Sequence, residues 1–218
     1  MGNITMSKQG LSIIELRERL AQEAARLVNE HGIQDYGLAK RKAARRFGIR
    51  EAGALPSNAE IEDCVREWHR IFEPDEHKKY LAELRRLAIK VMTLLPDFET
   101  RLAGSVLTGV ITANSFIELH LFSDAPENVA MKLEEHGIAY RNCQRRYRYD
   151  SRCTSLIPGF RFTYRGERID ALVFPEKGLR QAPMSPIDQR PIRRAHAGKI
   201  LKLLSSQVEN ELAQKTND

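Results

Sequence analysis

The sequence has few cysteines, no long apolar run and no apolar signal segment, and each of these shortages excludes a class of protein. Its three cysteines are an odd number without a CxxC pair, which argues against a zinc ribbon and against a secreted disulfide framework. No segment approaches the roughly twenty apolar residues that a membrane-spanning helix needs, and the first ten residues contain no apolar core. We therefore expect a cytoplasmic protein without a membrane partner.

Basic residues are the part of the composition that points to a partner. The 218 residues contain 35 Lys and Arg against 29 Asp and Glu, a formal net charge of +6. Such a balance favours anionic partners, among them nucleotides and RNA. Hydrophobic residues make up 42% of the chain, enough for the core of one or two soluble domains.

The hydrophobic pattern changes its period near Pro96. Before it, apolar residues recur at three- and four-residue steps and predict four helices, over residues 11–30, 36–47, 57–72 and 74–95. After it come an alternating strand around 116–121, a helix over 126–136, a hairpin with its turn at Arg165-Gly166, and a last helix from about Ile192. We expect an α+β fold, with a helical region over residues 1–96 followed by a small mixed-sheet domain over residues 97–218 that ends in a helix.

The first candidate site residues are the glycine and serine of the segment "GSVLTGVITANSFIELHLF", which begins at Gly104. A Gly104-Ser105 turn between a strand and a short helix lets backbone N–H groups and a hydroxyl approach phosphate oxygens, because glycine has no side chain to block them. The turn therefore predicts a phosphate-binding position.

Two carboxylates supply the second half of the candidate site. Phe116, Glu118 and His120 share one face of the strand that follows the turn. Asp170 interrupts a later apolar strand, and it would meet Glu118 if the two strands are neighbours. Two close carboxylates repel unless a cation joins them, which is how Mg²⁺ sites for phosphoryl chemistry are built. We predict Mg²⁺ at Glu118 and Asp170, with His120 as a further candidate ligand.

Each of these residues also has a purely structural interpretation. Glu118 and His120 would line the solvent side of a half-buried strand if the alternation reflects burial alone. Asp170 would form a salt bridge with Arg168 or another cation.

The spacing of these residues resembles that of the polymerase-β-like nucleotidyltransferase superfamily, which has a Gly-Ser turn, an acid-hydrophobic-acid run and a third acid on a later strand. Gly104 and Ser105 match the turn, "NSFIEL" stands at the acidic run and Asp170 matches the third acid. The chain as a whole also resembles a bacterial group described loosely as nucleotidyltransferase-like, in segments such as "LPSNAEIEDCVREW" and "APMSPIDQRPIRRA".

The resemblance implies a metal-dependent nucleotidyltransferase that moves a nucleotide from a nucleoside triphosphate to an RNA, small-molecule or protein acceptor. Ser105 would hold a terminal phosphate, and Glu118 and Asp170 would bind the metal. Phe116 stands at the first acid position and cannot coordinate an ion. The alternative is therefore a catalytically inactive member of the fold, which binds nucleotide or RNA as a regulator or adaptor.

Three groups of basic residues are candidates for contact with phosphate. The first lies on the predicted helix 36–47, the second on an arginine- and tyrosine-rich segment, and the third before the last helix, where it would reach a triphosphate. A solvated helix face balanced by nearby acids and a charged sheet edge are the structural alternatives. The residues are Lys40, Arg41, Lys42, Arg45 and Arg46; Arg145 and Arg146; and Arg190, Arg193 and Arg194.

Overall fold

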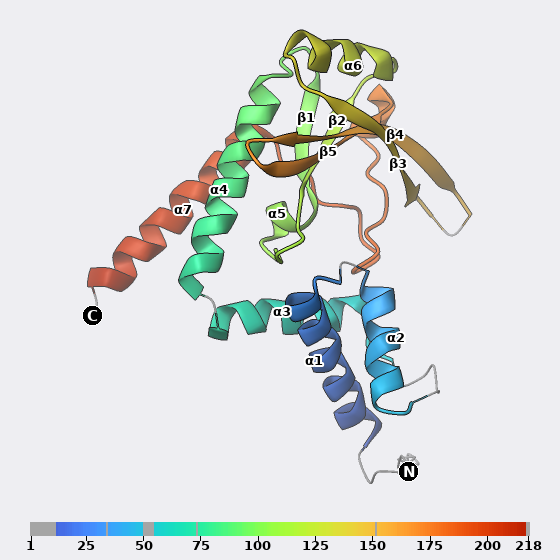
Figure 1. The fold of residues 1–218 in the computed structure, drawn as a ribbon, viewed down its shortest axis with the longest axis vertical. Coiled ribbons are helices and arrows are strands. Elements are labelled where there is room, and N and C mark those ends of the chain that lie inside the picture. Colours follow the sequence, from blue (N-terminus) through green and yellow to red (C-terminus); the bar gives the residue numbers. More distant parts are fainter. Residues whose placement is uncertain (1–11, 34, 50–54, 73, 151, 217–218) are drawn as a thin grey trace. The chain divides into compact units, whose positions relative to one another are not determined.

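A computed structural model of the protein describes residues 12–33, 35–49, 55–72, 74–150 and 152–216, without the side chains of 74, 208 and 210–216. These residues form seven α-helices and one five-stranded sheet (Figure 1), so the predicted α+β class is confirmed. The chain divides into two compact units. The helical unit comprises residues up to 77 with 110–115 and 186–189, and the sheet unit comprises 78–109, 116–185 and the residues from 190 onward.

The helical unit contains α1 (Ile13–His31), α2 (Tyr36–Arg46) and α3 (Asn58–Phe72). A side chain caps the N-terminus of each of these helices. Asp35 accepts a hydrogen bond from the Gly37 N–H at 2.7 Å at the start of α2, and reciprocal capping boxes form at residues 12–15 for α1 and 57–60 for α3. Leu11, where the first helix was predicted to begin, lies outside the described residues. The apolar faces of the three helices form one core, which includes Leu16, Leu20, Ala24, Ala39, Ala43, Ile61 and Val65.

The sheet unit contains β1 (Glu99–Ala103), β2 (Ile117–Phe122), β3 (Tyr140–Arg148), β4 (Thr154–Tyr164) and β5 (Glu167–Phe174) in the order β1-β2-β5-β4-β3. Only the β2–β5 pairing among these strands is parallel. The predicted turn at Arg165-Gly166 joins β4 to β5, and both of its residues have positive φ, 53° and 89°, as a tight two-residue hairpin turn requires.

The remaining helices of this unit flank the strands. They are α4 (Pro74–Thr93), α5 (Gly104–Thr108), α6 (Pro126–Glu135) and α7 (Ala197–Thr216), with a 3₁₀-helix, η2, at Glu176–Leu179. Figure 1 shows α4 and α7 side by side, and the Gln207 side chain donates a hydrogen bond to the Lys78 carbonyl at 2.9 Å. The apolar residues of β2, Ile117, Leu119 and Leu121, are fully buried, as their alternation predicted.

The last helix begins later than the sequence predicted. It starts at Ala197 rather than near Ile192, because Ala195 pairs with Leu102 of β1 through two backbone hydrogen bonds of 2.8 and 2.9 Å. The extended segment before α7 therefore carries Arg190, Arg193 and Arg194, which do not belong to a first helical turn.

The helices and the cysteines bear on two classes of protein that the composition excludes, membrane-spanning proteins and disulfide-bonded ones. Within the described part of the chain, no helix combines the length and the apolar character that crossing a membrane requires. Cys64, Cys143 and Cys153 are all free thiols, and Cys153 is exposed. The free state of these three thiols is consistent with the sequence argument against a disulfide framework.

Candidate functional site

The two acids singled out from the sequence lie on neighbouring strands. In the parallel pairing of β2 with β5, Glu118 is the register partner of Asp170. Both residues are buried, with 8% and 1% of their surface exposed, and His120 is completely buried. The interpretation of Glu118 and His120 as residues on a solvent-facing strand is therefore wrong, since the face that they share is covered.

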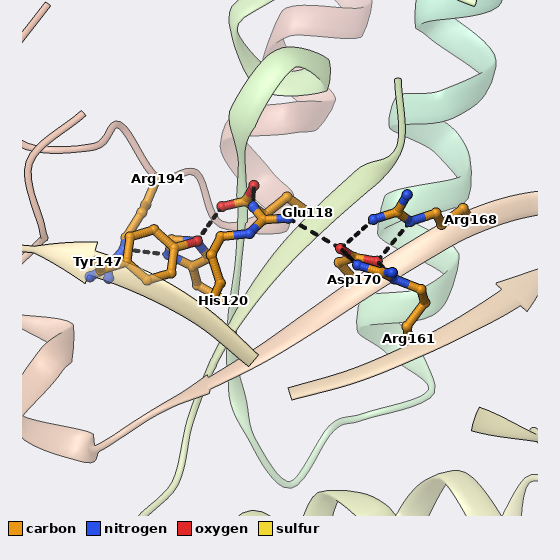
Figure 2. A network of polar contacts seen from close by, with 8 residues as sticks. Glu118, His120, Tyr147, Arg161, Arg168, Asp170 and Arg194 are labelled. Atoms are coloured by element: carbon orange, nitrogen blue, oxygen red, sulfur yellow. Dashed lines mark hydrogen bonds and ion pairs between the residues drawn. The ribbon is translucent and has the colours of Figure 1, made fainter. Parts of the chain in front are cut away.

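Three arginines surround Asp170, as Figure 2 shows for Arg161 and Arg168. Arg161 Nε lies 2.8 Å from Oδ1, Arg168 Nη2 lies 2.8 Å from Oδ2, and Arg145 Nη2 lies 3.1 Å from Oδ2. Burial opposes ionisation of Asp170, but the hydrogen bonds from Arg168 and Arg161 outweigh it and lower the pKa to about 2. The salt bridge with Arg168, which was left open from the sequence, is confirmed.

Glu118 has a mixed set of partners. Its Oε1 accepts a hydrogen bond of 2.7 Å from the Tyr147 hydroxyl and lies 2.8 Å from His120 Nε2, while Oε2 pairs with Arg145 Nη1. Burial opposes ionisation here too, but the contacts with His120 and the charge of Arg145 outweigh it and lower the pKa to about 2. Glu118 is thus a buried carboxylate whose two oxygens are both satisfied.

The arrangement of donors fixes the tautomer of His120. Arg194 Nε can only donate, and it lies 2.9 Å from His120 Nδ1, so Nδ1 is the acceptor. The ring proton is therefore on Nε2, where it is directed at Glu118 Oε1 (Figure 2). A ring whose Nδ1 accepts a hydrogen bond has only one N–H and is neutral, and burial lowers the pKa of His120 in the same sense.

Arg194 is held in place by aromatic rings as well as by His120. Its guanidinium carbon lies 4.7 Å from the centroid of Phe174 and 5.1 Å from that of Phe122. Its Nη1 also donates to the Gly178 carbonyl at 2.7 Å. Arg194 therefore lies in this site, where it contacts a histidine, and its contact with a triphosphate stays a prediction.

Phe116, at the position where the resemblance would place an acid, contacts two of the arginines that pair with the carboxylates. The guanidinium carbon of Arg168 lies 4.2 Å from the ring centroid, and that of Arg145 lies 5.2 Å from it. A cation over the face of an aromatic ring is attracted by the ring quadrupole. Phe116 therefore takes part in the arginine cluster as a stacking surface.

The Gly104-Ser105 turn lies beside Glu118. Gly104 has a φ of +69°, and a Cβ at this position would lie 3.3 Å from Glu118 Oε2, so the site needs glycine here for both backbone conformation and space. The buried Arg85 of α4 donates to the carbonyls of Val106 and Leu107 at 3.1 and 3.2 Å, which anchors α5. The predicted strand–turn–helix geometry is therefore present, with Ser105 in its first turn.

The other basic candidates lie away from these carboxylates. Arg146 is exposed and points to the opposite face of β3 from Arg145, and Arg190 and Arg193 are exposed on the segment before α7. In the helical unit, Lys40 donates to the Pro56 carbonyl at 2.7 Å and Arg46 pairs with Glu23 at 3.0 Å. Arg41, Lys42 and Arg45 are exposed and form no ion pair with any residue that the structure describes.

As arranged, the predicted ligands do not fit a divalent cation. Carboxylate oxygens are the ligands that Mg²⁺ requires, and each oxygen of Glu118 and Asp170 already accepts hydrogen bonds from neighbouring side chains. Over the described ranges, no three His, Cys, Asp or Glu side chains are grouped so that they could hold one ion. In this arrangement Glu118 and Asp170 act as acceptors for protein donors rather than as ligands of an ion.

Two contributors to the site were not among the sequence candidates, Tyr147 and Arg161, whereas Arg168 was considered only as a structural salt-bridge partner of Asp170. Arg161 was within reach of sequence reasoning, because counting outward from a two-residue turn at Arg165-Gly166 makes it the partner of Asp170. Tyr147 follows Arg145 by two residues on β3 and therefore shares its face. The signal for Tyr147 does not identify β2, the distant strand that carries its partner Glu118.

Comparisons of the chain with protein-family models and with curated proteins found no match. The nucleotidyltransferase resemblance therefore rests on the spacing of Gly104, Ser105, Glu118 and Asp170. A fold-level likeness of this kind does not by itself establish a reaction.

Proposed function

We propose that the sheet unit is a nucleotidyltransferase-like domain that binds a phosphorylated ligand, a nucleotide, through arginine side chains and without catalysing metal-dependent transfer. The observation that carries this proposal is the pairing of one carboxylate, Asp170, with three guanidinium groups. The whole site contains four arginines and two carboxylates, and the neutral His120 adds no charge. The arginines are Arg145, Arg161, Arg168 and Arg194, and the carboxylates are Glu118 and Asp170. The excess positive charge favours an anion.

Two of these arginines retain free donors that face solvent. The side chains of Arg161 and Arg168 are 45% and 40% exposed, and each uses only Nε and Nη2 to hold Asp170. Within the described residues, the Nη1 groups have no hydrogen-bond partner. Arginine recognises phosphate through such groups, and Asp170 keeps the two forks in a fixed orientation.

A further arginine adds to the unbalanced charge. Exposed Arg141 of β3 is the direct cross-strand partner of Arg161. Like charges placed opposite each other on neighbouring strands destabilise a sheet, and a bound anion relieves the repulsion. A cytoplasmic location, as predicted from the sequence, would expose this surface to nucleotides.

The proposal predicts that nucleotide binding does not require a divalent ion. In calorimetric titrations with ATP, GTP, CTP and UTP, we expect at least one nucleotide to bind in the presence of EDTA. The substitution Arg168→Ala should weaken that binding about tenfold or more, since a hydrogen bond to a charged group contributes about 1.5–3 kcal/mol.

Arg146→Ala is the matched control, because it removes the same charge from the opposite face of β3. We expect it to bind nucleotide as the unsubstituted protein does. Binding that depends on Mg²⁺, or transfer of a labelled nucleotide to an acceptor in Mg²⁺, would contradict the proposal and support the metal-dependent transferase. Binding of no nucleotide at millimolar concentration would overturn both.

A second function, binding of an RNA backbone by α2, is favoured by the distribution of charge in the helical unit. The arginines of α1 and α3 have nearby acids, whereas Arg41, Lys42 and Arg45 repel one another at three- and four-residue spacing. A run of phosphates would neutralise them. Six of the eight acids of α1 and α3 are already paired with arginines, in Glu23–Arg26, Glu30–Arg26, Glu60–Arg17, Glu62–Arg66, Asp63–Arg66 and Glu67–Arg70.

We predict that Arg41→Ala with Arg45→Ala weakens RNA binding and reduces the slope of log K against log salt by about 1.4, the value expected for two lost phosphate contacts on a single strand. The double variant Arg66→Ala with Arg70→Ala removes equal charge from paired arginines and should leave the slope unchanged. Filter binding over a range of salt concentrations measures both. Equal effects of the two double variants would argue against a specific role for α2.

A further inference from the structure

We infer that Arg145 is an internal cation that takes the place of a metal ion between Glu118 and Asp170. The two terminal nitrogens of its guanidinium contact different carboxylates, Nη1 that of Glu118 and Nη2 that of Asp170. Parallel pairing of β2 with β5 places these carboxylates side by side, so one planar cation spans both. This is the position in which the sequence predicted Mg²⁺.

The carboxylates require a cation at this position. Both are buried, and both accept hydrogen bonds from arginine at an oxygen of the carboxylate, as ionised carboxylates do. Asp170 has Arg161 and Arg168 as well, but Arg145 is the sole charged partner of Glu118 among the described residues, because His120 is neutral. The charge of Glu118 raises the pKa of Arg145 although burial acts against it. Arg145 therefore supplies the charge that a metal would otherwise bring.

Phe116 and Arg145 form a matched pair in this arrangement. Phe116 cannot act as a ligand, but its ring lies 5.2 Å from the Arg145 guanidinium carbon and helps to hold the side chain over the site. The Arg145 side chain is 30% exposed and extends from β3, which is an edge strand and lies two strands away from β5. Its length and its planar fork suit this span, as lysine would not.

An internal cation changes what the site can respond to. A guanidinium that is part of the chain is always present, whereas a bound Mg²⁺ depends on the concentration of the ion. The inference deepens the proposed function, since it explains why ligand binding would not need a divalent ion. It does not require that a nucleotide binds, because exchange of the cation can be followed with the metal alone.

The test is to remove Arg145 and add Mn²⁺. We expect Arg145→Ala to bind one Mn²⁺ at least tenfold more tightly than the unsubstituted protein in titrations followed by electron paramagnetic resonance. Adding Glu118→Gln to this variant should abolish the gain. Arg145→Lys, which keeps a positive charge, and Arg146→Ala, which removes a charge from the other face, should not gain Mn²⁺ binding.

Stability provides a second readout, since Arg145→Ala leaves Glu118 without a charged partner and is expected to melt at a lower temperature. Mn²⁺ should restore part of that loss because it binds the folded state.

If Arg145→Ala is unfolded in metal-free buffer, Arg145→Gln, which keeps a polar side chain of similar length, replaces it in the same titration. Absence of Mn²⁺ binding and of stabilisation by Mn²⁺ in both variants would overturn the inference, as would Glu118-dependent Mn²⁺ binding of equal strength in the unsubstituted protein.

Discussion

Replacing Asp170 by alanine is expected to destabilise the sheet unit by about 3–5 kcal/mol, the range found when one partner of a buried ion pair is removed. Asp170 is 1% exposed and is the ion-pair partner of both Arg161 and Arg168. Without it, these guanidiniums and that of Arg145 would face one another across β5 with only Glu118 to balance them. Both the lost attraction and the new repulsion act against folding.

Chemical denaturation followed through amide signals of β2 and β5 measures this loss in the sheet unit itself. Asp97→Ala is a suitable control, because Asp97 also pairs with a cation, Lys132, but has a side chain that is 60% exposed. Exposed pairs contribute about 1 kcal/mol or less, so the control should be nearly neutral. Equal losses in the two variants would show that the arginine cluster does not depend on Asp170.

Acid is expected to destabilise the sheet unit strongly between pH 4.5 and pH 2. The pKa of Glu118 falls from 4.5 to about 2 on folding, and that of Asp170 falls from 3.8 to about 2. A carboxyl with a lowered pKa stabilises the folded state fully above its ordinary pKa and loses that contribution as the pH falls through the folded value. At about 1.4 kcal/mol for each pKa unit, Asp170 contributes roughly 2.5 kcal/mol and Glu118 roughly 3.5 kcal/mol.

The variant Glu118→Gln separates this effect from general acid sensitivity. It should be less stable than the unsubstituted protein at pH 7, and the two curves of unfolding free energy against pH should converge as the pH falls towards and below 2, where Glu118 becomes protonated in the folded state as well. For Asp97→Asn, at an exposed position, the curve of unfolding free energy against pH should instead run parallel to that of the unsubstituted protein. A constant difference between Glu118→Gln and the unsubstituted protein over this range would rule out Glu118 as a source of the pH dependence.

Local patterns were sufficient to predict much of the sheet unit. Alternation in β2 identified the buried side chains of Ile117, Leu119 and Leu121, and the turn at Arg165-Gly166 identified the β4–β5 hairpin. Both signals lie within short segments, where backbone conformation and burial depend on neighbouring residues. The start of α7 was predicted too early because its determinant, the pairing of Ala195 with Leu102, joins distant parts of the chain.

The contacts of Arg145 and Tyr147 with the two carboxylates could not be predicted for the same reason. Arg145 was a candidate for nucleic-acid contact on the basis of its basic neighbours, and nothing in the segment around it indicates Glu118 or Asp170. Their contact depends on the strand order, which places β3 beyond β4 and lets a long side chain reach back over the sheet. The pair of acids was predictable as a pair, but the cation between them was not.

The position of Phe116 also sets the order in which this site could change during evolution. An aspartate at this position alone would enter the neighbourhood of Arg145 and Arg168, whose guanidinium carbons lie 5.2 and 4.2 Å from the present ring, and would form salt bridges there. Loss of Arg145 alone would leave Glu118 without its charged partner. An acid introduced at position 116 would therefore be neutralised by the arginines already present, and a second metal ligand there would become available only after Arg145 had been lost.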